Sequence, residues 1–139
     1  MAFTNTVNSG VELWVLDIQN KSARKITEAN LNANTRNPFS WFKDSNALLV
    51  KIISKDKKPL IDTKTAVPTG PTISISEEGI KAQNRTYQDL LKNPSDEHNF
   101  EQLTLAELHK VNINGQKFLW KENDMYDDLS FSPNGNYIL

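Results

Sequence analysis

The chain of 139 residues is long enough for one ordinary domain, and its modest hydrophobic fraction of 37% predicts a small core under a polar surface. Its 16 lysines and arginines nearly balance its 17 aspartates and glutamates, which argues against a dedicated nucleic-acid-binding protein. The sequence has no cysteine and no apolar run of about 18 residues, which excludes disulfides, thiolate metal sites, cysteine nucleophiles and a membrane-spanning helix.

The first 58 residues are predicted to form a succession of short β-strands. β-Prone runs separated by polar turns place these strands at residues 2–6, 13–18, 24–27, 39–42 and 47–53. The run at 24–27 contains Arg24 and Lys25, which suit an exposed outer strand because charge discourages the addition of a further strand.

Residues 59–105 differ in character from what precedes them, since four of the six prolines fall here. A short helix is predicted over residues 86–92, with Thr86 as its N-cap and Asn93 and Pro94 as its stop signal. The segment has too few apolar residues for a core of its own. We therefore interpret it as a Pro-rich insertion carrying one short helix.

The β pattern resumes after the insertion, with strands expected at residues 108–113 and 117–120. Asn114-Gly115 between them is the strongest hairpin signal in the chain, because Asn-Gly accepts positive φ at both turn positions. A second Asn-Gly pair lies between apolar runs at residues 129–131 and 137–139.

The same strand-turn-strand pattern thus occurs twice. Leu13 aligns with Leu108 and Ile18 with Ile113, 95 positions apart, and after the hairpin Asp44 aligns with Asn134, 90 positions apart. Recurring four-stranded units are typical of propeller blades, and two such units cannot close a ring.

The predicted fold class is therefore all-β, a partial β-propeller of about two antiparallel blades. We expect a single partial propeller domain over residues 1–139. Its first blade region would cover residues 1–58, the insertion residues 59–105, and a truncated second blade region residues 106–139. On this interpretation the chain is a piece of a larger protein.

A family resemblance adds to this interpretation. Residues 12–17, 24–27 and 39–45 resemble a TolB-like or WD-like blade. The insertion is more specific: Pro-Thr-Gly-Pro at 68–71, followed by Arg-Thr-Tyr-Gln-Asp-Leu-Leu at 85–91, resembles the N-terminal propeller of the prolyl oligopeptidase family. The glutamyl endopeptidase-like or dipeptidyl aminopeptidase-like branch is the most similar.

The resemblance implies an enzyme of two parts, in which a propeller restricts the access of substrates to a Ser-Asp-His triad in an α/β-hydrolase domain. This sequence contains no counterpart of that hydrolase domain. We therefore expect a non-catalytic fragment of the substrate-gating propeller of a serine peptidase. Its partners in the parent protein would be a peptide substrate and the catalytic domain.

The chain itself offers no predicted catalytic residue. None of its five glycines frames a serine in a Gly-x-Ser-x-Gly nucleophile turn. His98 lies in a polar run and is expected to be a solvated loop residue. His109 occupies a strand position equivalent to Trp14, so packing, or a place on a sheet edge, is expected for it.

Arg85 is the one candidate for substrate binding, because an arginine can pair bidentately with a substrate carboxylate. The alternative is a surface arginine at the start of a helix. Asp124, Asp127 and Asp128 are clustered but lack the alternating ligand pattern of a calcium loop, so a solvated turn is expected. No metal site and no cofactor are predicted.

Two further questions stay open at the level of sequence. The alternative function is a stand-alone interaction module that binds a partner by β-augmentation. Unpaired edges at residues 3–6 and 137–139 also predict that the isolated chain associates with itself. No nucleic-acid or membrane partner is expected. The N-terminus lacks the features of a signal peptide, and the location of the parent is unknown from the sequence: cytoplasm, periplasm and plastid are all open.

Overall fold

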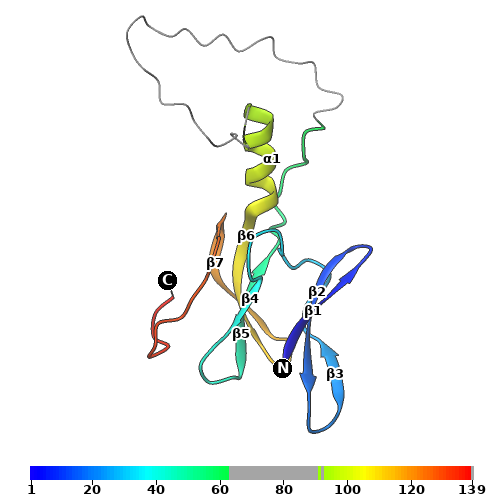
Figure 1. Ribbon diagram of the computed structural model, residues 1–139, viewed down its shortest axis with the longest axis vertical. Helices are drawn as coiled ribbons and strands as arrows, with labels where there is room; N and C mark the ends of the chain where they lie inside the picture. The colour runs from blue at the N-terminus through cyan, green and yellow to red at the C-terminus, as the bar shows by residue number, and fades with distance from the viewer. Residues whose placement is uncertain (63–90, 92, 139) are drawn as a thin grey trace, which may run out of the picture.

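The computed structural model describes residues 1–62, 91 and 93–138, and within them the chain forms seven strands and one helix (Figure 1). The N-terminal strands are β1 (Ala2–Val7), β2 (Gly10–Asp17) and β3 (Ser22–Lys25). β4 (Phe39–Trp41) and β5 (Ala47–Ile52) follow. Helix α1 (Pro94–Thr104) leads directly into β6 (Leu105–Asn112), and β7 (Lys117–Met125) is the last strand.

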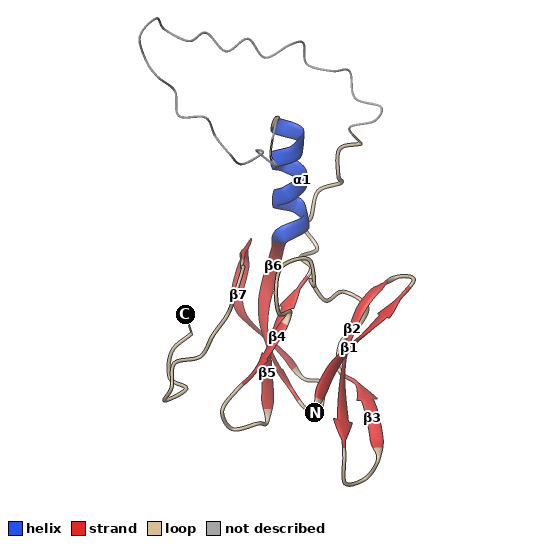
Figure 2. Ribbon diagram, in the orientation of Figure 1, coloured by secondary structure: helices blue, strands red, loops and turns tan. Residues whose placement is uncertain are grey.

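The strands form two antiparallel sheets, coloured red in Figure 2. The three-stranded sheet has the order β1-β2-β3, and the four-stranded sheet has the order β4-β5-β6-β7. This arrangement confirms the predicted all-β fold class and is consistent with a partial propeller, since the described strands close no barrel. Residues 59–105 connect β5 to its neighbour β6, so the predicted first and second blade regions share one sheet. The domain boundaries themselves stay a prediction.

The core lies between the two sheets and is built on strict alternation along β5. Leu48 and Val50 on its first face pack against Leu13 of β2, while Leu49 and Lys51 point to the opposite face. All six residues of β5 are buried, as expected for a strand covered on both sides. The buried cluster consists of Leu13, Ile26, Leu31, Leu48, Val50, Ile52 and Val111.

The segment after β7 covers the second face of the four-stranded sheet. Ser40 Oγ on β4 donates to the Leu129 carbonyl oxygen at 3.3 Å, and Lys43 Nζ donates to that of Pro133 at 3.3 Å. The Phe42 and Phe131 rings pack with centroids 4.8 Å apart. In the described part of the chain, the two sheets and the segment after β7 therefore form three successive layers, with α1 outside them.

The third layer repeats the hairpin of β4 and β5 in the same register. Phe131 bridges Ile138, as Trp41 pairs with Leu48. The turns also make equivalent hydrogen bonds: the backbone N–H of Asn46 donates to Asp44 Oδ1 at 3.0 Å, and the backbone N–H of Asn136 donates to Asn134 Oδ1 at 3.1 Å. This agreement is what the 90-residue alignment of the sequence requires.

The Asn114-Gly115 turn joins β6 to β7 as predicted, but its predicted geometry is wrong. Only Gly115 of the two takes a positive φ, of 89°. Its backbone N–H donates to the Asn112 carbonyl oxygen at 2.8 Å, and the N–H of Asn112 donates to the carbonyl oxygen of Gln116 at 2.9 Å. Such a three-residue loop needs the left-handed conformation at its last position alone.

Helix α1 lies at the C-terminal end of the predicted insertion, after the residues for which a helix was expected. The helix expected over residues 86–92 lies outside the described residues apart from Leu91, so its stop signal at Asn93 and Pro94 stays a prediction. These two residues begin α1: Asn93 Oδ1 accepts the backbone N–H of Asp96 at 3.0 Å, and proline fits the first turn because an N–H there would have no intrahelical acceptor. No helix in the described part of the chain is long and apolar enough to cross a membrane.

Candidate functional site

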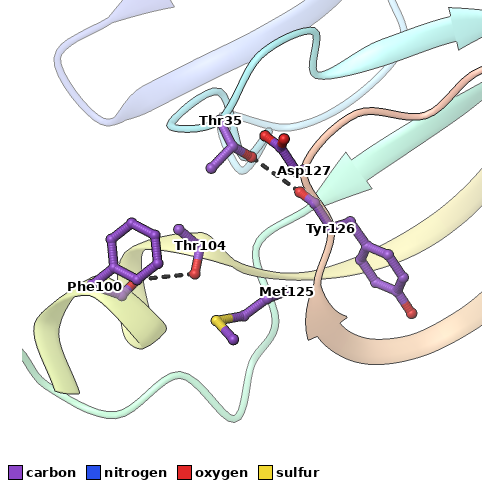
Figure 3. Close-up of a pocket in the computed structure, with 6 residues that line it drawn as sticks. All are labelled: Thr35, Phe100, Thr104, Met125, Tyr126 and Asp127. Carbon is purple, nitrogen blue, oxygen red and sulfur yellow. Dashed lines mark hydrogen bonds between the residues drawn. The ribbon is translucent and has the colours of Figure 1, made fainter. Parts of the chain in front are cut away.

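A cavity of about 180 Å³ lies between α1 and the end of β7 (Figure 3). Phe100 and Thr104 extend from the helix on one side, and Met125 lies beside them. The remaining wall comes from the loop after β3 and the segment after β7. The lining residues are Thr35, Phe100, Thr104, Met125, Tyr126 and Asp127.

The helix that walls this cavity is fixed at its C-terminal end by a buried amide. Asn32 Nδ2 donates to the Leu103 carbonyl oxygen at 3.1 Å and to that of Leu105 at 2.9 Å. Asn34 Nδ2 adds a bond to the carbonyl oxygen of Leu103 at 2.8 Å from an exposed position. These contacts satisfy carbonyls that a helix end leaves without intrahelical partners.

Replacing Asn32 with alanine is expected to lower the free energy of unfolding by about 2–3 kcal/mol, because the Leu105 carbonyl oxygen loses its amide donor and a fully buried side chain is removed. Asn34→Ala removes a similar bond at an exposed position, where water can replace the amide, and should cost less than about 1 kcal/mol. Denaturant titration of both variants measures the difference. Equal losses would contradict a special role for the buried amide.

Lys51 lies beneath the cavity and is fully buried on the second face of β5. Its Nζ donates to the Thr35 carbonyl oxygen at 2.6 Å, to Thr35 Oγ1 at 3.1 Å and to the Asp127 carbonyl oxygen at 2.7 Å. Burial lowers the pKa of the Lys51 ammonium, and the carboxylates of Asp127 and Asp128 offset part of that effect. Lys51 thereby ties two distant loops to the centre of the sheet.

The cavity is suited to holding a small apolar group. Its polar atoms already have partners: Thr35 Oγ1 donates to the Tyr126 carbonyl oxygen at 3.1 Å, and Asp127 pairs with Arg36 at 3.0 Å. An adjoining groove of about 510 Å³ runs along α1 and shares Phe100 and Met125 with it. These lining groups include no nucleophile held by a base.

The structure places His98 in a different element from the one that the sequence predicted. His98 belongs to α1, so the loop assignment was wrong. Its Nε2 lies 3.1 Å from the Pro59 carbonyl oxygen and tethers the chain leaving β5. Arg85, the candidate for substrate binding, lies outside the described residues.

His109 lies on β6, an interior strand, so it packs but is no edge residue. Its Nε2 lies 2.8 Å from Glu107 Oε2, and the equivalent Trp14 Nε1 donates to Glu12 Oε2 at 2.9 Å. Ser54 Oγ donates to the other oxygen of Glu107 at 3.3 Å. In a catalytic triad the histidine stands between serine and acid. Here the acid stands between them, so the histidine does not contact the hydroxyl.

The repeat equivalent of Glu107 gives a prediction about acid stability. Hydrogen bonds from Trp14 and Asn5, with the charge of Lys25, lower the pKa of Glu12 in the folded protein below 4.5. Its stabilising effect is present above the unfolded pKa and is lost as pH falls through the folded value. Denaturation between pH 7 and pH 3 should show a smaller acid loss for Glu12→Gln than for wild type. Glu101→Gln, at an exposed position, should behave as wild type.

The three clustered aspartates are used separately. Asp124 and Asp128 each accept the backbone N–H of the following residue, at 2.7 and 3.1 Å, while Asp127 pairs with Arg36. In the described ranges no group of three or more histidine, aspartate and glutamate side chains could hold a metal ion.

Comparisons with known proteins place the chain beside plant peptidases. No family model matches it, and no solved structure matches it. It is 30% identical over 133 residues to a probable chloroplastic glutamyl endopeptidase of Oryza sativa subsp. japonica, and 29% identical over 130 residues to that of Arabidopsis thaliana. These alignments cover 93% and 91% of the chain. The chain spans only 14% and 13% of the length of these relatives, so it is similar to a limited part of each peptidase.

Proposed function

We propose that this chain is a non-catalytic part of a glutamyl endopeptidase-like serine peptidase and that it forms part of a substrate-gating propeller. The observation that carries the proposal is the stack of three layers in which the third repeats the register of β4 and β5. Repetition of a stacked sheet is how a propeller is built. The similarity to a limited part of two peptidases supports the peptidase assignment.

In this proposal the chain restricts the access of substrates to the active site of the parent and supplies no catalytic residue. Successive sheets stacked around an axis would restrict which peptides reach a Ser-Asp-His triad supplied by a separate catalytic domain. Arg85 stays a sequence prediction for the group that meets a substrate carboxylate.

The purified chain is expected to hydrolyse no glutamyl peptide, because the described residues hold no activated nucleophile. A fluorogenic glutamyl substrate, with the intact parent enzyme as positive control, measures this directly. Turnover by the chain that survives repurification would contradict the non-catalytic assignment.

The flanking genomic sequence tests the peptidase assignment independently. An in-frame hydrolase domain with a Gly-x-Ser-x-Gly turn downstream would support it. A stop codon with no remnant of such a domain nearby would count against it.

A second candidate function, a stand-alone interaction module, is favoured by one observation. The outer edge of β7 carries no paired strand among the described residues, and most of the strand is exposed. A stop codon directly after residue 139 in a stably expressed gene would favour this alternative over the first proposal.

A further inference from the structure

The packing of the three-stranded sheet on the four-stranded sheet indicates how a further sheet could pack on the other side of the four-stranded sheet. The three-stranded sheet packs its Leu13 face against the first face of the four-stranded sheet, which carries Leu48 and Val50. Leu13 is the repeat equivalent of Leu108, which points to the second face of the four-stranded sheet beside Lys51. Each unit therefore presents its second face to the first face of the next unit.

The outer rim of this interface also has a defined contact. Arg24 on β3 donates a hydrogen bond to the carbonyl oxygen of Ile113 in the β6–β7 turn. Arg24 lies opposite Val15, as Phe118 lies opposite the equivalent Lys110. Phe118 is thus the counterpart of Arg24, and Ile18 is the counterpart of Ile113. If another three-stranded sheet were stacked on the four-stranded sheet by the same contact, its Ile18 would lie against Phe118.

Both of these apolar side chains are exposed, Ile18 on the three-stranded sheet and Phe118 on the four-stranded sheet. Ile18 is 68% exposed in the β2–β3 turn, and Phe118 is 55% exposed on β7. Trp120 beside Phe118 is 46% exposed although it contacts Phe42 of the second face, with ring centroids 5.6 Å apart. Each sheet thus offers an exposed apolar surface that the other sheet of a second copy would cover.

The edge of β1 is open as well. Met1 and Leu16 exchange backbone hydrogen bonds of 2.7 and 2.9 Å, so the alternation of antiparallel pairs directs the backbone groups of Thr4 and Thr6 away from β2. The equivalent strand β5 has β4 along that edge. Residues 129–131 are a second strand of the β4 type, held by a single bridge from Phe131 to Ile138.

We infer that copies of this chain associate head to tail. The three-stranded sheet of one copy lies beside residues 129–131 on the second face of the four-stranded sheet of the next, with Ile18 against Phe118 and with Ile138 displaced. Its β1 pairs with residues 129–131 and replaces the single bridge. The interface is heterologous, and it closes into a ring when the number of layers fits. Two layers from each copy and four to eight blades in a propeller give rings of about two to four copies.

The inference depends on the stacking geometry that the proposed function also uses, but not on a peptidase ancestry. Light scattering of the wild-type chain at several concentrations should give masses that are multiples of 15.8 kDa. Ile18→Glu and Phe118→Glu should each weaken association by roughly thirtyfold or more, since each places an unpaired charge against an apolar side chain that the contact would cover. Leu60→Glu, in the segment after β5 at 48% exposure, should assemble as wild type.

Mixing the two defective variants gives the decisive result. Each blocks a different half of a heterologous contact, so one intact interface remains and a 1:1 heterodimer should form. Circular dichroism of each variant verifies folding beforehand. A monomeric wild type at high concentration, wild-type assembly of Ile18→Glu, or the absence of a heterodimer would each overturn the inference. None of these outcomes would affect the genomic test of the peptidase assignment.

Discussion

Replacing Lys51 with methionine is expected to lower the free energy of unfolding by about 2–4 kcal/mol, although methionine fits an apolar strand well. The ammonium is the donor to the backbone carbonyls of Thr35 and Asp127, and both oxygens would lose it inside the protein. The two loops would also lose their common anchor on β5. Urea titration of wild type and variant measures the change.

Lys121→Met is the matched control, since Lys121 is an exposed strand lysine on β7. Its effect should stay within about 0.5 kcal/mol. Equal effects of the two substitutions, or a more stable Lys51→Met, would show that the buried ammonium costs more in desolvation than its three bonds return.

The pH dependence separates the charge of Lys51 from its shape. Its pKa is lowered by folding from 10.5, so between the folded value and 10.5 the unfolded chain binds more protons. The wild type should therefore gain stability relative to Lys51→Met as pH rises through the alkaline range toward 10.5. Burial also raises the pKa of Tyr126 above 10.0, which lowers the stability of both proteins at more alkaline pH and therefore cancels in the comparison.

Gly10→Ala is expected to cost about 3 kcal/mol or more. Gly10 begins β2 with φ of +146°, a conformation that L residues rarely adopt. An added Cβ would also lie 2.2 Å from the backbone oxygen of Ala29, which no side-chain rotation can relieve. The loop after β3 would have to move away from β2, where Leu31 N–H now donates to the Val11 carbonyl oxygen at 3.0 Å.

Gly115→Ala measures the cost of a positive φ alone, without a steric clash of the added Cβ. Its φ is +89°, but nothing lies within 4 Å of the added Cβ. A loss of about 1 kcal/mol is expected there. Thermal unfolding of the two variants gives the comparison. Similar losses of stability would mean that the loop containing Ala29 can move away from the added Cβ at little energetic cost.

The strands could be predicted because local signals determine them. β-Branched and aromatic runs bounded by polar turns marked β1 and β5 to within one residue and β2 to within three. The membership of the sheets could not be predicted in the same way. β5 pairs with β6 across the whole insertion, and no local signal states which distant strands become neighbours.

Two parts of the site were missed for identifiable reasons. Asn followed by proline fits both the end and the beginning of a helix, and the acidic pair Asp96 and Glu97 was the signal that favoured a beginning. Lys51 resembles the charged residues that protect sheet edges. Its position inside the most apolar run of the chain, at residues 47–53, was the feature that pointed to burial instead.

The pairing of β5 with β6 has a consequence for how the chain folds. The hairpins β4–β5 and β6–β7 are local and can form early, but Ile52 must find Glu107 across a long intervening loop before the sheet exists. The entropy of closing such a loop grows only logarithmically, by about 0.6 kcal/mol for each doubling of its length. Halving the connection would therefore speed this docking step by only about threefold, so the fold can carry a long insertion at this position at little kinetic cost.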